Sequence, residues 1–135
     1  MIRLDPATFV SGQITPAEVA EAAAAGVKTI INNRPDGEEP GQPTSADIAA
    51  AAKAAGLAYH HIPVSRGFSH TEVEAMAEAL ENGPVLAFCR SGTRSTYLWA
   101  LARTRGGEDP ATLIERGRAV GYDLRSLTSY LGSLS

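Results

Sequence analysis

The 135-residue sequence has a single cysteine, so it cannot form an intramolecular disulfide. Its cysteine and histidines do not have the spacing of a zinc site. No stretch approaches the roughly 20 apolar residues of a membrane span, and the N-terminal residues lack the apolar core of a signal peptide. We therefore expect no metal or cofactor, no membrane association, and a reducing, cytoplasmic location.

Basic residues are also scarce. The 12 Lys and Arg residues are outnumbered by 15 Asp and Glu residues, which gives a formal net charge of -3. Nucleic-acid binding relies on clustered Lys and Arg, so the composition argues against nucleic acid as a partner. The hydrophobic content of 44% is average for a globular domain. Since a chain of this length can bury its own core, we expect a single domain over residues 1–135.

Three segments repeat one order of signals: a Ser or Thr start, a helical stretch, a stop at Gly or Asn-Gly, and a short apolar run. This alternation predicts an α/β domain with a mainly parallel sheet. Strands are expected at 27–31, 57–64 and 85–88, and helices after Thr15, Thr44 and Ser69, then at 95–105, after Asp109, and from Asp123 to Leu131. The continuous apolar run 85–88 is typical of a central strand that is covered on both faces.

Cys89 ends this apolar run and is followed by a short loop containing Gly92 and then by a predicted helix. Backbone N–H groups of such a loop, together with those of the first helical turn, bind anions. Arg94 adds a planar cation that can bind an oxyanion through two hydrogen bonds. Cysteines in such surroundings are thiolates at neutral pH. We therefore predict that Cys89 is a catalytic nucleophile and that Arg94 acts with it.

The remaining loop residues are predicted to bind the substrate: Arg90, Ser91, Gly92, Thr93 and Ser95. Gly92 is expected to take a positive φ, which lets the backbone approach the ligand closely. Ser95 could donate to the thiolate or to a leaving sulfur, and Arg90 either faces solvent or recruits an acidic substrate. The alternative is an inert, buried cysteine. It is disfavoured because a glycine, two arginines and three hydroxyl residues crowd into the six positions after Cys89.

The one long irregular stretch, residues 32–43, follows a predicted strand and therefore lies at the same sheet edge as Cys89. Arg34 and Asp36 on this stretch are candidates for substrate binding, and Asp36 for a general acid. The alternative is purely structural. Pro35-Asp36-Gly37 is a good turn signal, and Arg34 could pair with Asp36 or Glu38 to hold the loop.

Several segments resemble the phosphatase-like domain of beta-lactamase hydrolase-like proteins, a family similar in fold to the dual-specificity phosphatases. The resemblance covers nearly the whole chain and rests on Phe9-Val10-Ser11-Gly12-Gln13, residues 30–38, His61-Ile62-Pro63-Val64 and the cysteine loop. It implies a four- or five-stranded sheet with helices on both faces and a cysteine–arginine anion loop at its carboxyl edge. It also implies that relatives can be fused to, or encoded beside, a persulfide dioxygenase, which makes such an enzyme a candidate partner.

Two features depart from the phosphatases. These enzymes place five residues between Cys and Arg, whereas four separate Cys89 from Arg94, as in the loop of rhodanese sulfurtransferases. The aspartate that serves dual-specificity phosphatases as general acid is also missing from Ser65–His70. Losing a positioned acid costs about 10²–10⁴-fold in rate, although Asp36, Glu38 or His70 could substitute. Persulfide transfer needs no such acid.

The favoured function is therefore sulfur transfer, in which Cys89 takes sulfane sulfur from thiosulfate or a persulfide and passes it to a thiol acceptor. The first alternative is a protein-tyrosine or dual-specificity-type phosphatase that forms a phosphocysteine. The second is a non-catalytic module that binds anions or phosphopeptides. The expected ligand is accordingly a small sulfur-containing anion, a persulfide or a phosphorylated substrate.

Overall fold

Five short strands form one sheet in the order β1-β2-β5-β3-β4 in the computed structural model, which describes residues 1–134. The strands are β1 (Ile2–Asp5), β2 (Thr8–Ser11), β3 (Thr29–Asn32), β4 (Ala58–His61) and β5 (Val85–Phe88). Only β1 pairs in an antiparallel sense, with β2, and the other neighbouring strands are parallel. The predicted α/β class with a mainly parallel sheet is confirmed, as is the central place of β5.

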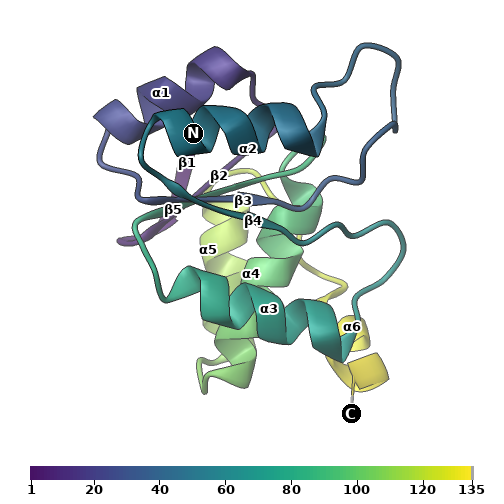
Figure 1. Cartoon of the computed structure of the whole chain (residues 1–135). Coiled ribbons are helices and arrows are strands. Elements are labelled where there is room, and N and C mark those ends of the chain that lie inside the picture. The colour runs from purple at the N-terminus through teal and green to yellow at the C-terminus, as the bar shows by residue number, and fades with distance from the viewer. Residues whose placement is uncertain (135) are drawn as a thin grey trace.

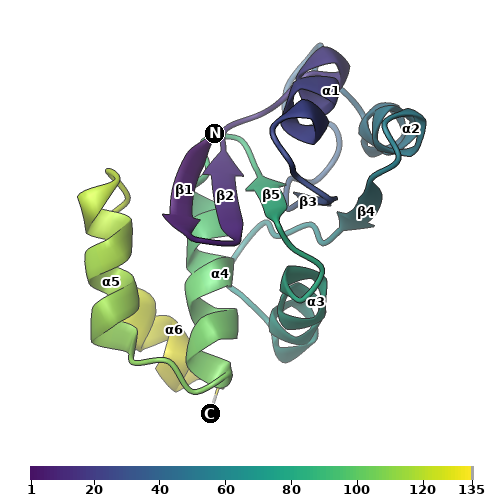
Figure 2. The ribbon, with the colours of Figure 1, turned by 90° about the vertical axis from the view of Figure 1, so that its left-hand side faces the viewer.

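Helices cover both faces of this sheet (Figure 1). One face carries α1 (Pro16–Ala24) and α2 (Ser45–Ala54), and the other carries α3 (His70–Leu80) and α4 (Thr93–Arg105), with α5 (Pro110–Ala119) and α6 (Leu127–Leu134) packed outside α4. Figure 2, seen along the sheet, shows β5 and β3 between the two layers. A helix on each face explains why every residue of β3 and β5 is buried.

Two apolar cores result from the alternation of side chains along the strands. Ile30 and Leu86 pack with α1 and α2, whereas the neighbouring Ile31 and Ala87 pack with α3 and α4. The first three helices all begin with the reciprocal hydrogen bonds of a capping box, at Thr15, Thr44 and Ser69. These start signals were predicted from the sequence. They fix the residue at which each of the three helices begins.

The elements differ from the sequence-based expectation in several places. Strands β1 and β2 were not predicted. Strand β1 is short and lies at an edge. It pairs with β2 after a turn in which the Asp5 carboxylate accepts from the Ala7 N–H. The last helix begins at Leu127, because Asp123 binds the N–H and the guanidinium of Arg125 and so does not cap a helix. Helix α4 begins at Thr93, two residues earlier than expected.

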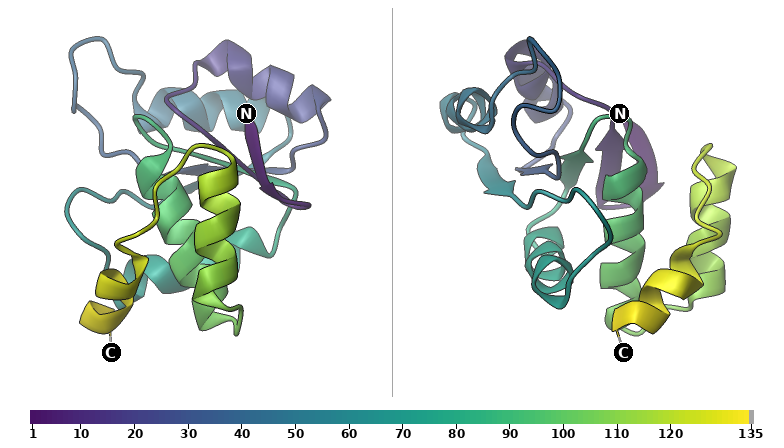
Figure 3. Two further views of the ribbon diagram at one scale, coloured as in Figure 1. Left: turned by 180° about the vertical axis from the view of Figure 1, so that it is seen from behind. Right: turned by 90° about the vertical axis from the view of Figure 1, so that its right-hand side faces the viewer.

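Three loops gather at the carboxyl edge of the parallel strands, because β3, β4 and β5 all end there. They are residues 33–44 after β3, 62–69 after β4 and 89–92 after β5. The first two project together on the right of Figure 1, and the right-hand view of Figure 3 looks onto this edge. Of the helices formed within residues 1–134, none is long and apolar enough to cross a bilayer. The same residues hold no group of three or more His, Cys, Asp or Glu that could bind a metal.

Candidate active site

Cys89 lies at the end of β5 with its side chain completely buried. Its backbone N–H donates to Ser11 O at 3.4 Å, and the Gly92 N–H donates to the Cys89 sulfur at 3.1 Å. A hydrogen bond donated to sulfur favours the anionic form of a thiol. The end of β2 packs closely on the loop, since a Cβ on Gly12 would lie 3.0 Å from Arg90 O. The sulfur is therefore held in a fixed place, with a backbone N–H directed at it.

Gly92 has the predicted positive φ, 95°, and is the N-cap of α4. Its carbonyl accepts the backbone N–H and the hydroxyl of Thr96, at 2.9 and 2.7 Å. The side chains of Arg90, Ser91 and Thr93 are exposed, so the loop turns its backbone rather than these side chains toward the sulfur. Because α4 starts at Thr93, the N–H groups of its first turn directly follow the loop, and that of Thr93 donates to Ser91 Oγ at 3.5 Å.

Arg94 is fixed by groups from both neighbouring loops. Its Nη1 donates to Val64 O at 2.7 Å and to Glu38 Oε2 at 2.8 Å, and its Nη2 donates to Glu38 Oε1 at 2.8 Å. The hydrogen bonds that the Glu38 carboxylate accepts raise the pKa of Arg94, and the negative charge of Cys89 raises it further. The fold thus brings Cys89 and Arg94 together, with Glu38 setting the orientation of the guanidinium.

Glu38 lies between two arginines, because Arg34 Nε also donates to its Oε1 at 2.8 Å. The hydrogen bonds from Arg94, followed by those from Arg34, lower the pKa of Glu38 from 4.5 to about 2. Glu38 is therefore ionised at neutral pH. This excludes it as the substitute general acid that the sequence left open.

Arg34 is almost fully buried, with 3% of its side chain exposed, and all its nitrogens are hydrogen-bonded. Besides Glu38, it binds Gln13 Oε1 at 3.0 Å and Glu39 Oε1 at 2.6 Å. Glu39 in turn pairs with Arg90 at 3.1 Å. Arg34 thus anchors the two glutamates that bind the two arginines of the cysteine loop. This matches the structural alternative for Arg34 rather than direct contact with a substrate.

Two other candidates also differ from expectation. Asp36 accepts a hydrogen bond from the Ser45 N–H at 2.8 Å, so its carboxylate is engaged at the start of α2. Ser95 is completely buried, and its hydroxyl has no hydrogen-bond partner among residues 1–134. Ser95 therefore makes no hydrogen bond to the Cys89 sulfur in this structure, and its donation to a leaving sulfur stays a prediction. Because α4 begins at Thr93, Ser95 lies within the helix rather than in the loop.

Sequence reasoning missed Glu39 and Tyr122. It considered Glu38 as an acid and as a partner of Arg34, but not as a partner of Arg94. The Tyr122 hydroxyl donates to Ser91 O at 3.1 Å, from a segment beyond α5 that carries no motif. The glutamates left a weak signal, two carboxylates close after Arg34 on the loop predicted to lie beside Cys89. Nothing in the sequence pairs Tyr122 with the cysteine loop.

Comparison with known proteins places this site in a family. Residues 2–106 match the model described as "Beta-lactamase hydrolase-like protein, phosphatase-like domain". The beta-lactamase hydrolase-like protein of Agrobacterium fabrum (strain C58) is 41% identical over 137 residues, which cover 96% of this chain and 31% of that protein. The chain thus spans less than a third of the length of that curated relative.

Solved structures agree on the fold. A proposed phosphatase from Neisseria meningitidis Z2491 superimposes with a TM-score of 0.83 at 36% identity, over 98% of this chain and 96% of that one. Pseudomonas aeruginosa TpbA, solved in complex with pTyr, has a TM-score of 0.66 at 23% identity, over 98% and 83% of the two chains. The chain has the fold of the cysteine phosphatases, and it belongs to the family of beta-lactamase hydrolase-like protein, phosphatase-like domains.

Proposed function

We propose that this protein is a cysteine-dependent phosphatase that hydrolyses aryl phosphomonoesters. The proposal rests on one arrangement of groups at the start of α4. The Cys89 sulfur accepts the Gly92 N–H, and Glu38 holds the Arg94 guanidinium beside this loop. The family description and the relative from N. meningitidis favour the phosphatase alternative over the sulfurtransferase that loop length favoured.

In the first step the Cys89 thiolate attacks phosphorus. The S–P bond forms as the P–O bond to the leaving group breaks, and the leaving oxygen carries away the electron pair. Arg94 and the N–H groups at the start of α4 stabilise the negative charge on the transferring phosphoryl oxygens. In the second step water attacks the phosphocysteine, the S–P bond breaks, and inorganic phosphate and the thiolate are released. The proton of the attacking water passes to solvent or to the departing phosphate.

The proposal requires a good leaving group, because the two carboxylates considered as the general acid, Glu38 and Asp36, are engaged in other contacts. Glu38 is ionised between two arginines, and Asp36 is bound at the start of α2. A phenolate can leave without a proton far more readily than an alkoxide can. We therefore propose phosphotyrosine-like substrates. TpbA, which shares the fold, has been solved with pTyr bound.

Sulfur transfer is the second candidate, and the four-residue spacing between Cys89 and Arg94 favours it. In that reaction the thiolate takes the outer sulfur of thiosulfate, an S–S bond breaks as another forms, and sulfite leaves. No general acid is needed. A persulfide dioxygenase partner stays a prediction from the resemblance.

Two assays on one preparation separate the candidates. The phosphatase should hydrolyse p-nitrophenyl phosphate but hardly any glycerol phosphate, and Cys89→Ser should be inactive on both. After incubation with thiosulfate, the mass of the intact protein should not change. An adduct of about 32 Da that dithiothreitol removes, without aryl phosphatase activity, would establish sulfur transfer and overturn the proposal.

A further inference from the structure

Tyr122 lies directly against the cysteine loop although it follows α5, outside the residues 2–106 matched by the family model. Its hydroxyl donates to Ser91 O at 3.1 Å. Its ring covers Gly92 so closely that a Cβ there would lie 2.2 Å from the hydroxyl oxygen and 2.9 Å from Cζ. The contact therefore includes both a hydrogen bond and close packing.

The hydrogen bond acts on the peptide group whose N–H donates to the Cys89 sulfur. The Ser91 carbonyl and the Gly92 N–H belong to one planar peptide, in which the two groups point in opposite directions. Tyr122 binds the carbonyl on one side, and the N–H lies 3.1 Å from the Cys89 sulfur on the other. Fixing the carbonyl therefore fixes the direction of the N–H.

The Tyr122 hydroxyl is suited to this role because it stays protonated. Burial raises the pKa of Tyr122 above its usual 10.0, and the negative charge of Cys89 raises it further. At neutral pH the phenol is therefore a hydrogen-bond donor and not a phenolate that would repel the thiolate.

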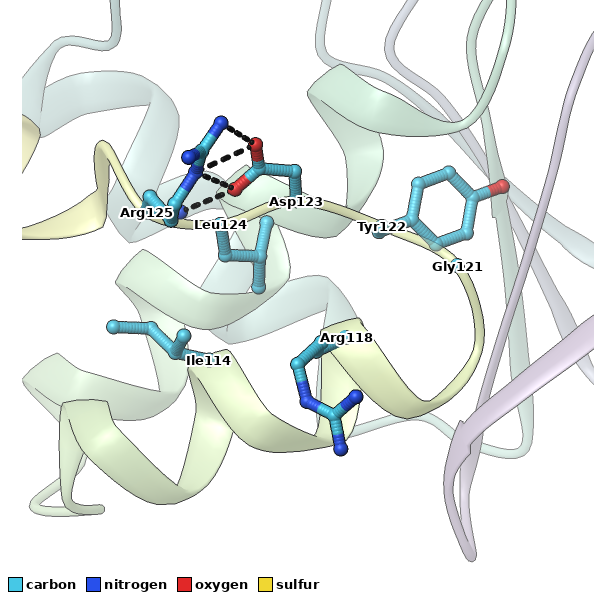
Figure 4. Close-up of a pocket in the computed structure, with 7 residues that line it drawn as sticks. All are labelled: Ile114, Arg118, Gly121, Tyr122, Asp123, Leu124 and Arg125. Atoms are coloured by element: carbon cyan, nitrogen blue, oxygen red, sulfur yellow. Dashed lines mark hydrogen bonds and ion pairs between the residues drawn. The ribbon is translucent and has the colours of Figure 1, made fainter.

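Two glycines place Tyr122 over the loop. Gly121 has φ 95° and turns the chain back after α5, and the Tyr122 N–H donates to Gly117 O at 2.8 Å. A Cβ on Gly117 would lie 2.7 Å from Leu124 Cδ1, so a larger residue there would force the Leu124 side chain to move. Figure 4 shows Leu124 directed toward α5 and the Tyr122 hydroxyl pointing away from it. The α5–α6 connection is thus anchored on one side and presents Tyr122 on the other.

We propose that Tyr122 is a positioning residue of this site: by holding the Ser91–Gly92 peptide, it aims the Gly92 N–H at the Cys89 sulfur and at the phosphoryl group that the sulfur receives. The effect on turnover rests on the proposed phosphatase function. The effect on the reactivity of the cysteine does not, because alkylation needs only the thiolate.

The test compares Tyr122→Phe with the wild type and with Tyr97→Phe. The control also loses a hydroxyl contact in the C-terminal part of the chain, the 3.3 Å bond from the Ser126 N–H, but not one to the cysteine loop. Removing an oxyanion donor outright costs about 10²–10³-fold in turnover. In Tyr122→Phe the Gly92 N–H remains, and only its direction is less well fixed. We therefore expect kcat on p-nitrophenyl phosphate to fall about tenfold, with KM nearly unchanged. Alkylation of Cys89 by iodoacetamide at neutral pH should slow several-fold.

Native alkylation rates in a folded Tyr122→Phe protein, or equal losses in Tyr97→Phe, would overturn the inference. Thermal unfolding reports whether each variant is folded. If Tyr122→Phe does not fold, the same kinetic and alkylation measurements are made on Tyr122→Leu, which also lacks the hydroxyl. Slower alkylation in a protein that has no phosphatase activity even as wild type would refute the proposed function and still support the role of Tyr122.

Discussion

Replacing Glu38 by Gln tests the arginine network that holds the site. Glu38 accepts two hydrogen bonds from Arg94 and one from the buried Arg34. A carboxamide offers one oxygen acceptor and places its NH₂ group against a guanidinium donor. The substitution therefore removes both the negative charge and the bidentate geometry while leaving the size of the side chain unchanged.

The magnitude follows from the shift in pKa. Folding lowers the pKa of Glu38 from 4.5 to about 2, and one pKa unit corresponds to about 1.4 kcal/mol. The ceiling is thus about 3.4 kcal/mol, and because 26% of the side chain is exposed, solvent screening reduces it to about 1–2 kcal/mol. The folded pKa lies below the unfolded one, so this stability is fully present well above pH 4.5 and is lost as the pH falls toward 2.

Urea unfolding of the wild type and Glu38→Gln at a series of pH values measures this effect. We expect the variant to be less stable by about 1–2 kcal/mol at neutral pH, with the difference shrinking steadily below about pH 4.5. Glu78→Gln is the matched control, because Glu78 is exposed on α3. A Glu38→Gln deficit that does not change with pH, or that is no larger than that of the control, would refute the ionised network.

Other substitutions probe the loop itself. Cys89→Ser should abolish turnover in a folded protein, since a serine hydroxyl stays protonated; retained hydrolysis of p-nitrophenyl phosphate would exclude Cys89 as nucleophile. Arg94→Lys should lower kcat/KM nearly as much as Arg94→Ala, because a point charge cannot replace the planar fork, and near-native kinetics would reduce Arg94 to a general charge. Gly92→Ala should destabilise the fold by about 1–3 kcal/mol, owing to its positive φ and its contact with Tyr122, as urea unfolding would reveal.

Much of the fold could be predicted because its signals are local. The capping boxes at Thr15 and Ser69 and the apolar run of β5 each depend on a few neighbouring residues. Strands β1 and β2 could not be found in this way, because they are short and are held by pairing with each other and, for β2, with β5. The start of α4 was placed two residues too late, at residue 95. The left-handed conformation of Gly92 lets the helix begin directly after this glycine, at Thr93.

The site likewise has a part that could be predicted from local sequence and a part that could not. Cys89, Gly92 and Arg94 form a contiguous motif whose chemistry is readable from residue types. The contacts that orient them come from afar: Glu38 is 56 residues from Arg94, and Tyr122 is 31 residues from Ser91. Such pairs form through the topology of the sheet edge and the packing of α5. No local pattern encodes them, which is why Asp36 seemed as good a candidate as Glu38.

The short loop has a consequence that bears on the choice between sulfur and phosphorus. Four residues separate Cys89 from Arg94, and the last of them, Thr93, is the first residue of α4. Arg94 therefore lies in the first turn of this helix. Two other loops then fix the guanidinium, through Glu38 and Val64 O. The anion site is therefore shaped by contacts from outside the loop as well as by its length. The spacing between Cys89 and Arg94 is therefore by itself a weak guide to the reaction. Replacing Glu38 should change the rate of phosphoryl transfer although the cysteine loop keeps its sequence.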